Sequence, residues 1–260
     1  MTALSRESKR VLALFGKTPK KVVPSVGDEQ EYFLIKKDAY RKRRDLVITG
    51  RTLFGAAPCK GQELEEHYFG AIRPTVSAYM KDLDDELWAL GIPAKTKHNE
   101  VAPCQHELAP VYGEVNEAID QNLVMMEKMK LIASRHDLVC LLHEKPFEGI
   151  NGSGKHNNWS LGTESENLLD PGDTPLDNLQ FIVFLTAVIE AVDNYQELLR
   201  APLPRPATTI VWAPTRLLRR LCPSSWATSL PRSSRRSSMA RLPSMPRAAC
   251  STWAPIPCPS

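Results

Sequence analysis

The chain has 260 residues and a formal net charge of +3, and 42% of it is hydrophobic, which is typical of a globular protein. Its six cysteines lack a CxxC spacing, which argues against a zinc site; with no signal peptide, this favours a reducing cytoplasm. The longest apolar run, near Leu179–Ile189, is too short to span a bilayer, so we expect no membrane partner.

The average charge conceals two different regions. Residues 1–200 contain all 30 acidic residues and 24 of the 33 basic ones, whereas residues 201–260 contain nine arginines, no lysine, no acid and no glycine. The second region also has 11 of the 21 prolines. Because it has no apolar period, it cannot bury enough surface to offset the entropy of ordering, and we predict a disordered tail.

The first part of the chain mixes helical and strand patterns. Residues 4–20 carry basic and apolar residues at helical spacing and predict a helix. Strands are predicted at residues 30–36 and 45–49, on either side of the basic cluster Arg41–Arg44. We interpret this cluster as a solvated turn rather than a nucleic-acid patch, so we expect no nucleic-acid partner.

Three further helices are predicted. Residues 74–90 form an amphipathic pattern that Gly91 closes, and residues 114–136 form another. Asp173–Pro175 offers a cap followed by a proline, and predicts a helix over residues 176–200. In the second helix the expected core stripe recurs every three or four residues: Val115, Ile119, Leu123, Met126, Met129 and Ala133.

A glycine-rich loop lies between two strand patterns. Residues 138–142 are continuously apolar, as in a buried strand, and residues 156–161 alternate at period 2. One face of the second strand is polar: His156, Asn158 and Ser160. The loop glycines permit positive φ and a close backbone approach, which suits a loop that folds over an anion or an amino acid: Gly149, Gly152 and Gly154. A simple hairpin turn is the alternative.

Two acidic clusters precede this loop. Glu29 and Glu31 are two residues apart, so in a strand their carboxylates share one face, and like charges that close repel unless cations lie between them. Glu100 and Glu107 share a face only if the chain turns near Pro103. Mg²⁺ prefers such oxygen ligands, and one imidazole is more compatible with Mn²⁺. A solvated acidic surface is the alternative for each cluster.

Five segments together resemble the type III glutamine synthetases over roughly residues 10–200: GDEQEYFLI, ITGRTLFGAAPCKGQELEEHYFG, KTKHNEVAPCQHELAP, LVCLLHEKPFEGINGSGKHNNWSL and NLLDPGDTP. The resemblance implies an α+β fold, in which an antiparallel sheet with flanking helices forms part of a barrel-like active site. It also implies ATP-dependent ligation of ammonia to glutamate through a γ-glutamyl phosphate, with two or three Mg²⁺ or Mn²⁺ ions. The family forms homo-oligomeric rings, with a dodecamer expected, and its active sites are shared between neighbouring subunits.

The resemblance also assigns roles to single residues. Glu31, Glu100 and Glu107 look like ligands of one ion, and Glu29 with His156 like ligands of the ion beside the nucleotide phosphates. The remaining assignments concern the substrates: Asn151 and Gly152 for glutamate, and Asn158 and Ser160 for ATP. Two cysteines, Cys59 and Cys104, depart from the family pattern, and a thiol at Cys104 could perturb the metal site or make it oxidisable.

Beyond Arg200 the family pattern stops. Codons compatible with residues 207–227, when read from their third base, permit a string that resembles the next segment of the family. Our hypothesis is therefore an out-of-frame tail at residues 201–260, after an N-terminal remnant at residues 1–28 and a partial catalytic domain at residues 29–200. The alternative is a genuine basic tail that binds RNA or anionic membrane.

On this hypothesis the 260-residue chain lacks part of its catalytic set, and we expect it to be inactive. Two other functions stay open from the sequence. One is a non-catalytic fragment that binds a metal or a nucleotide, and the other is a related glutamate–amine ligase.

Overall fold

The computed structural model describes residues 1–53, 60–171 and 178–200. The predicted tail at residues 201–260, Cys59 and the predicted cap at Asp173–Pro175 lie outside these residues. The chain divides into two compact units, and the first contains all the described residues except Arg200. None of the described helices has the length and apolar character that crossing a lipid bilayer requires.

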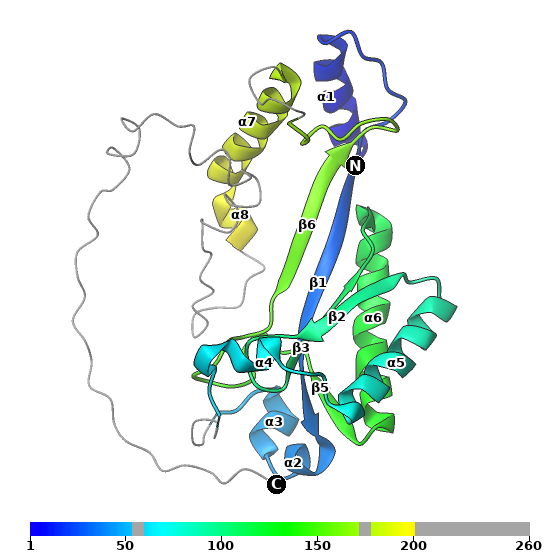
Figure 1. Ribbon diagram of the computed structural model, residues 1–260. Helices are drawn as coiled ribbons and strands as arrows, with labels where there is room; N and C mark the ends of the chain where they lie inside the picture. The colour runs from blue at the N-terminus through cyan, green and yellow to red at the C-terminus, as the bar shows by residue number, and fades with distance from the viewer. Residues whose placement is uncertain (54–59, 172–177, 201–260) are drawn as a thin grey trace, which may run out of the picture. The chain divides into compact units, whose positions relative to one another are not determined.

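Helices and strands alternate irregularly along the described chain, as in an α+β fold (Figure 1). In chain order the elements are α1 (Thr2–Ala13), β1 (Val23–Lys36), α2 (Lys37–Arg41), α3 (Arg44–Thr49), η1 (Glu63–Glu65), α4 (Glu66–Phe69), α5 (Pro74–Ala89), β2 (Ala94–Asn99), β3 (Gln105–Pro110), β4 (Gly113–Glu114), α6 (Val115–Arg135), β5 (Leu138–Leu141), β6 (Lys155–Gly162), α7 (Leu179–Asn194) and α8 (Gln196–Arg200).

The long strand β1 is the centre of a single antiparallel sheet (Figure 1). β3 and β4 pair with one of its edges, β5 and β6 with the other, and β2 pairs with β3. Gln30 of β1 therefore lies between Leu108 of β3 and Lys155 of β6. The strand predicted at residues 30–36 is confirmed, but it begins seven residues earlier, at Val23.

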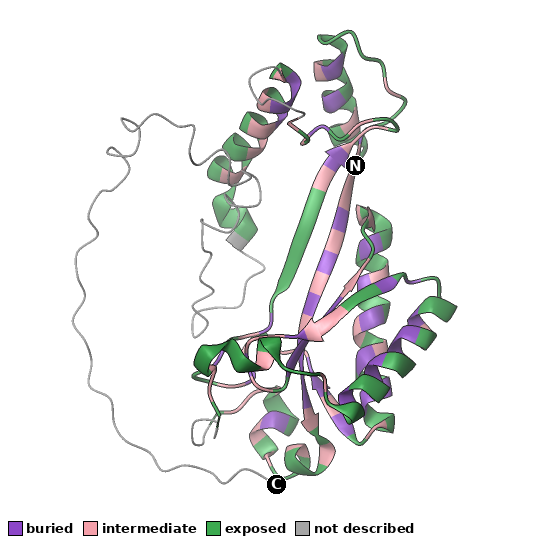
Figure 2. Ribbon diagram, in the orientation of Figure 1, coloured by how far each residue is buried: buried purple, intermediate pink, exposed green. Residues whose placement is uncertain are grey.

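Burial alternates along β1, which defines two faces of the sheet (Figure 2). Asp28, Gln30 and Tyr32 are buried on the face that carries α5 and α6. Glu29 and Glu31 are only half-buried, on the opposite face. The period-2 prediction for these side chains is confirmed, because successive residues of a strand point to opposite sides of the pleat.

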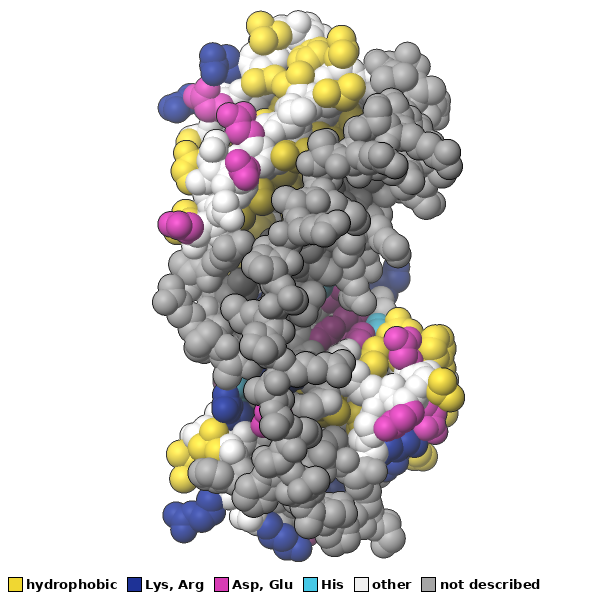
Figure 3. Space-filling model, turned by 90° about the vertical axis from the view of Figure 1, so that its left-hand side faces the viewer, with side chains coloured by type: hydrophobic (Ala, Val, Ile, Leu, Met, Phe, Trp, Pro, Cys, Tyr) yellow, Lys and Arg dark blue, Asp and Glu magenta, His cyan; other side chains and the backbone are white. Residues whose placement is uncertain are grey.

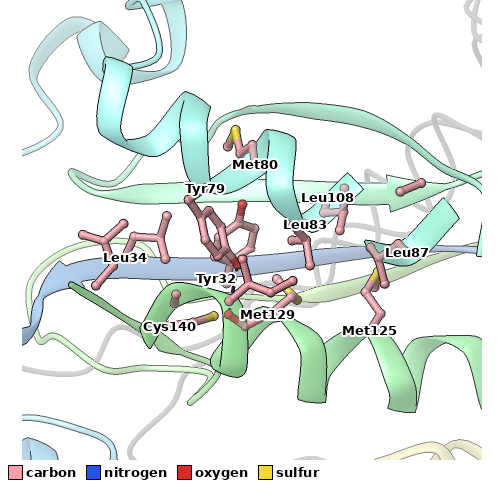
Figure 4. Packing of buried hydrophobic residues seen from close by; sticks show 14 of the residues in the cluster. Tyr32, Leu34, Tyr79, Met80, Leu83, Leu87, Leu108, Met125, Met129 and Cys140 are labelled. Atoms are coloured by element: carbon pink, nitrogen blue, oxygen red, sulfur yellow. Dashed lines mark hydrogen bonds between the residues drawn. The ribbon is translucent and has the colours of Figure 1, made fainter. Parts of the chain in front are cut away.

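The main core lies between β1, α5 and α6, as Figure 4 shows in close view. Tyr32 is fully buried there, and its ring centroid lies 6.2 Å from that of Tyr79. The Tyr79 hydroxyl donates to the Met129 carbonyl oxygen at 3.3 Å, which joins α5 to α6. The helix predicted over residues 74–90 is confirmed as α5, and Gly91 follows it with φ +78°.

The glycine-rich loop is not a hairpin turn. β5 and β6 both run antiparallel to β1, and they follow one another along the same edge of that strand. Two strands that run in the same direction cannot form a hairpin, so the hairpin alternative is wrong. Residues 142–154 instead leave the edge of the sheet and return to it, which places the loop beside the half-buried face of β1.

The strand predicted at residues 45–49 is wrong, because these residues belong to helix α3. Asp45 Oδ1 accepts the N–H of Leu46 at 3.0 Å, and Gly50 ends the helix with φ +74°. Val47, Ile48 and Thr49 are exposed, and Leu46 alone within α3 is buried. The basic cluster before it forms the junction of α2 and α3, where Arg43 pairs with Asp45 at 2.6 Å.

Two helices have different limits from those predicted. The helix predicted over residues 4–20 ends at Ala13, because the chain turns at Gly16, which has φ +74°. The helix predicted over residues 176–200 begins after Asn178, whose side-chain oxygen accepts the N–H of Phe181 at 2.9 Å. It breaks at Tyr195, so that α7 and α8 are separate helices.

The predicted stripe on α6 is confirmed only in part. Met129 and Ala133 are buried as expected, but Ile119 and Leu123 are 50% and 63% exposed. Four other residues complete the buried face: Ala118, Asn122, Met125 and Ile132. Both sets satisfy helical spacing, so the pattern alone could not choose between them. Asn122 is accommodated on the buried face because Lys155 Nζ of β6 donates to its Oδ1 at 2.6 Å.

Because Met129 is buried and Leu123 is exposed, truncating these two side chains of α6 should destabilise the protein to different extents. Met129→Ala removes a fully buried side chain and should lower the free energy of unfolding by about 2–5 kcal/mol. Leu123→Ala, on the exposed side, should change it by less than about 0.5 kcal/mol. Urea unfolding followed by circular dichroism measures both, and equal losses would contradict the face assigned to α6.

Candidate active site

The register of the sheet brings four of the predicted metal-binding side chains to one face. Glu29 of β1 lies directly opposite His156 of β6, and Glu31 lies directly opposite Glu107 of β3. Cross-strand partners point to the same side of a sheet, so their donor atoms converge. In the space-filling view of Figure 3, acidic side chains gather beside a histidine in the middle of the molecule.

Glu29 connects β1 to β6 through both of its carboxylate oxygens. Its Oε2 lies 2.8 Å from His156 Nδ1, and its Oε1 accepts from Asn158 Nδ2 at 2.6 Å. The side chains of Glu29 and His156 are 21% and 48% exposed. This pair is therefore accessible from the solvent and is held in place by the neighbouring amide.

Glu31 holds the glycine-rich loop. Its Oε2 accepts the backbone N–H of Gly154 at 2.7 Å and the side-chain amide of Gln105 at 3.3 Å. The same Gln105 nitrogen donates to the carbonyl oxygen of Gly152 at 3.0 Å. Gln105 is almost fully buried, and the sequence analysis assigned no role to it. A carboxylate of the sheet and the loop over it are thus joined by one buried amide.

Glu100 and Glu107 approach each other because the chain turns between β2 and β3. The Gln105 N–H donates to the Ala102 carbonyl oxygen at 3.1 Å, and the Glu100 N–H donates to the Gln105 carbonyl oxygen at 2.9 Å. The turn expected near Pro103 is confirmed.

His98 is a further site residue, which the sequence analysis missed. It lies opposite Glu107 in the register of β2 with β3. Its Nε2 is 3.0 Å from Glu107 Oε1, and its Nδ1 is 3.7 Å from Glu100 Oε1. The donor atoms of His98, Glu100 and Glu107 all lie within 4.8 Å of one another. The signal in the sequence was the two-residue spacing of His98 and Glu100 in a strand pattern.

The pKa values of the groups in this cluster are shifted in the direction that reduces its negative charge. Burial raises the pKa of Glu107, and the charge of Glu29 raises it further. Burial and the charge of Glu107 raise the pKa of Glu100. Burial lowers the pKa of His98, but hydrogen bonding to the Asn99 carbonyl and the charge of Glu107 more than offset this and raise it.

Divalent cations fit this set of donors. Carboxylate oxygens with an imidazole nitrogen are ligands of Mg²⁺ and Mn²⁺, and a cation between these carboxylates would remove the repulsion that raises their pKa values. The side chains present therefore match the metal ions that the sequence resemblance implied.

Asn151 is held by a residue far away in the sequence. Gln62 Nε2 donates to Asn151 Oδ1 at 3.0 Å, and Gln62 Oε1 accepts the backbone N–H of Asn151. Gly152 follows, and a side chain at this position would overlap the carbonyl oxygen of Glu144. The two residues expected to bind glutamate therefore lie in a segment that is fixed on both sides.

Asn158 and Ser160 lie further along the same face of β6. With Ser25 and Tyr112 they line an open hollow of about 690 Å³. Ser160 Oγ donates to Asn167 Oδ1 at 2.5 Å, so the segment after β6 closes one side of the hollow. Along the sheet, the Glu29–His156 pair therefore lies between the residues expected near ATP and the cluster of His98, Glu100 and Glu107.

Residues 8–193 match the family model described as glutamine synthetase, catalytic domain. The chain belongs to this family. Its α+β architecture with an antiparallel sheet is therefore the glutamine synthetase catalytic domain fold, as the sequence resemblance implied.

Three known proteins illustrate the similarity. The chain is 61% identical over 202 residues to a glutamine synthetase of Butyrivibrio fibrisolvens, which covers 77% of this chain and 29% of that protein. It is 50% identical over 208 residues to a type-3 glutamine synthetase of Dictyostelium discoideum, which covers 79% and 28%. A solved glutamine synthetase of Plasmodium falciparum is 19% identical, covers 66% of this chain and 36% of that one, and has a TM-score of 0.46. The chain spans less than a third of the length of the curated relatives.

Cys104, which the sequence resemblance marked as a departure from the type III glutamine synthetases, lies inside the turn between Glu100 and Glu107. Cys104 has φ +64°, a left-handed conformation that disfavours any residue with a Cβ atom. Burial raises the pKa of its thiol, and the Arg73 charge lowers it less. The residue itself is nonetheless exposed to solvent. Cys59, the other departure, lies outside the described residues.

The left-handed conformation predicts that Cys104→Gly stabilises the protein. Removing the Cβ atom relieves a backbone strain of about 1 kcal/mol, and the midpoint of urea unfolding should rise accordingly. Cys104→Ala is the matched control, because it removes the thiol but keeps the Cβ atom. A glycine variant no more stable than the alanine variant would contradict the assigned strain.

The tight packing of Gly152 predicts a second effect. Gly152→Ala should lower the free energy of unfolding by about 1–3 kcal/mol, because the added methyl group overlaps backbone. Gly113→Ala is the control, since nothing lies within 4 Å of a methyl group there, and its effect should stay below about 0.5 kcal/mol. Thermal unfolding compares the two variants, and equal effects would exclude the packing described for the loop.

Proposed function

We propose that this domain serves the ATP-dependent ligation of ammonia to glutamate, through a γ-glutamyl phosphate. The observation that carries this proposal is the convergence of five predicted donors on one sheet face beside the glycine-rich loop: Glu29, Glu31, Glu100, Glu107 and His156. Glutamate and ATP both bring negative charge, and their reaction requires that this charge be neutralised while the reactants are aligned. Relatives named glutamine synthetase support the same reaction.

The metal ions would be divided between two groups of side chains. Glu29 and His156 would hold the ion beside the nucleotide phosphates, while Glu31, Glu100 and Glu107 would surround the other. Mg²⁺ or Mn²⁺ bound there supplies Lewis-acid stabilisation of the transferred phosphoryl group. The amide of Asn158 donates to Glu29 and would hold its carboxylate in place for the ion.

The loop residues would bind glutamate. Because Asn151 Oδ1 accepts from Gln62, the group that Asn151 offers to a substrate carboxylate is its Nδ2 amide. Gly152 lets the backbone approach the same substrate without a side chain in between. Glu31 and Gln105 anchor this segment to the sheet, and the loop would exclude water from the acyl phosphate.

ATP would occupy the hollow beside Asn158 and Ser160. Its open side admits a ligand from the solvent, and Asn158 in its wall donates to Glu29 Oε1 at 2.6 Å. The phosphates would thus point towards the metal-binding side chains, as phosphoryl transfer to glutamate requires.

For the whole protein we propose a cytoplasmic homo-oligomeric ring. Large apolar side chains that are exposed on α6 and α7 support contacts with further protein: Ile119, Leu123, Leu131, Leu179 and Ile189. We keep the division of the chain at residues 1–28, 29–200 and 201–260, with the last region out of frame, as part of this proposal.

The proposal predicts metal binding without turnover by the 260-residue chain. Mn²⁺ at a hundredfold excess over its Kd should stabilise the fold by about 2.7 kcal/mol, and Glu107→Gln should abolish most of this gain. Glu127→Gln, on the exposed side of α6, is the matched control and should keep it. Differential scanning calorimetry measures the shift, and a chain that Mn²⁺ does not stabilise would refute the metal sites.

The absence of turnover has its own test. Glutamine formation is assayed with the purified chain, ATP, glutamate, ammonia and Mg²⁺ or Mn²⁺, and we expect none. Glutamine synthesis above the level of a Glu29→Gln variant would show that the chain is complete enough for catalysis, and would overturn the expected inactivity.

A further inference from the structure

We propose that Gln62 is a positioning residue of the glutamate site, because it fixes which end of the Asn151 amide faces the substrate. The inference rests on the proposed function, in which Asn151 binds a carboxylate of glutamate. An exposed asparagine can present either its Nδ2 donor or its Oδ1 acceptor, whereas a carboxylate oxygen only accepts hydrogen bonds. Binding of glutamate therefore requires that Asn151 be held in one of two orientations.

The backbone of Asn151 fixes the orientation of the Gln62 amide. A backbone N–H can only donate, so the Gln62 atom that receives the Asn151 N–H is the oxygen Oε1. The oxygen and the nitrogen of a side-chain amide are attached to the same carbon, on opposite sides of it. The second contact between the two residues, 3.0 Å from Asn151 Oδ1, is therefore made by Gln62 Nε2. Hydrogen-bonding chemistry thus assigns both ends of the Gln62 amide.

The orientation of Asn151 follows from that of Gln62. Nε2 of an amide carries two hydrogens and does not accept, so the Asn151 atom that faces it must be the acceptor Oδ1. Nδ2 of Asn151 is then turned away from Gln62, and its hydrogens point to where a substrate carboxylate would lie beside Gly152. Gln62 therefore determines that this part of the site offers donors rather than an acceptor.

The segment that carries Gln62 is anchored to the sheet. The Glu65 N–H donates to the Gln62 carbonyl oxygen at 3.1 Å, at the start of η1. In α4, which follows directly, His67 Nδ1 donates to the carbonyl oxygen of Glu100 at 2.6 Å. Gln62 therefore reaches the glycine-rich loop from a segment fixed at the end of β2, although Asn151 lies 89 positions further along the chain.

Backbone strain marks the same segment. Leu64 and Glu65 are consecutive residues with φ +54°, a left-handed conformation that disfavours residues with a Cβ atom. Such conformations persist only where the surrounding contacts enforce them, and they cluster at ligand-binding sites. The Leu64 side chain does not enforce this turn by packing, because the residue is 96% exposed. The contacts of Gln62 and His67, on either side of the turn, hold it instead.

A substitution that reverses the hydrogen bond tests the inference. Gln62→Glu keeps the length of the side chain and the acceptor for the Asn151 N–H, but it replaces the Nε2 donor with a second acceptor. The Asn151 amide should then turn Nδ2 towards the introduced carboxylate and Oδ1 towards the substrate. Isothermal titration calorimetry of the full 260-residue chain in excess Mn²⁺ measures the Kd of L-glutamate. We expect this Kd to rise at least about tenfold, because a hydrogen bond to a charged group is lost.

The introduced charge acts on an anionic ligand by itself, and a double-mutant cycle separates this effect. An Asn151→Ala background has no side-chain amide to turn, while the added charge is the same. In this background Gln62→Glu should raise the Kd by less than about threefold, as an exposed charge does.

Gln121→Glu is the matched control. Gln121 Nε2 also donates to a side-chain oxygen, Glu117 Oε1 at 3.0 Å, but on the exposed side of α6. The same chemical change there should leave the Kd of L-glutamate unchanged. Circular dichroism of each variant verifies that the fold is retained.

The outcomes separate the inference from the function on which it rests. If Gln62→Glu leaves the Kd unchanged, or raises it by the same factor in both backgrounds, the inference is wrong and the proposed glutamate site stands. Where Gln62→Glu unfolds, Gln62→Met decides, because it removes the donor without adding charge, and an unchanged Kd would again contradict the inference. If the unsubstituted chain binds no L-glutamate, the inference and the proposed glutamate site both fail, whereas stabilisation by Mn²⁺ tests the metal sites separately.

Discussion

The pairing register of β1 decides where four donors of the site lie. With Gln30 between Leu108 and Lys155, the carboxylates of Glu29 and Glu31 face His156 and Glu107 across the sheet. A shift by one residue would turn these carboxylates towards α5 and α6 and expose the opposite face. Tyr32 opposes such a shift, because its fully buried ring is packed in the main core.

Packing on one face of β1 stabilises the fold, whereas charge repulsion on the other face opposes it. The helix-covered face gains stability from burial, while the other face concentrates carboxylates whose pKa values burial and mutual repulsion raise. The apolar core fixes the strands rigidly enough to hold these groups together. Gln105 extends this rigidity to the loop, because one buried amide contacts Glu31, Gly152 and Ser153. A preorganised set of anionic donors is what cation binding requires.

Local patterns predicted those features that depend on local geometry. The pleat of a strand has a fixed period, so the shared face of Glu29 and Glu31 and the polar face of β6 followed from spacing. The turn near Pro103 followed from the position of a proline between two carboxylates. Patterns that are compatible with more than one local structure did not predict the observed one reliably. Residues 45–49 suggested a strand but form α3, and α6 offered two apolar stripes of which the sheet selected one.

The sequence by itself determined the family, the residue types of the site and the strands that carry them. Each of these features depends on the order of residues within a short segment. Only the tertiary structure decided which side chains meet. The pairing of Gln62 with Asn151 joins residues 89 positions apart, and the approach of His98 to Glu107 depends on the register of β2 with β3. Such contacts arise from packing and strand pairing between distant segments, and no local pattern in the chain records them.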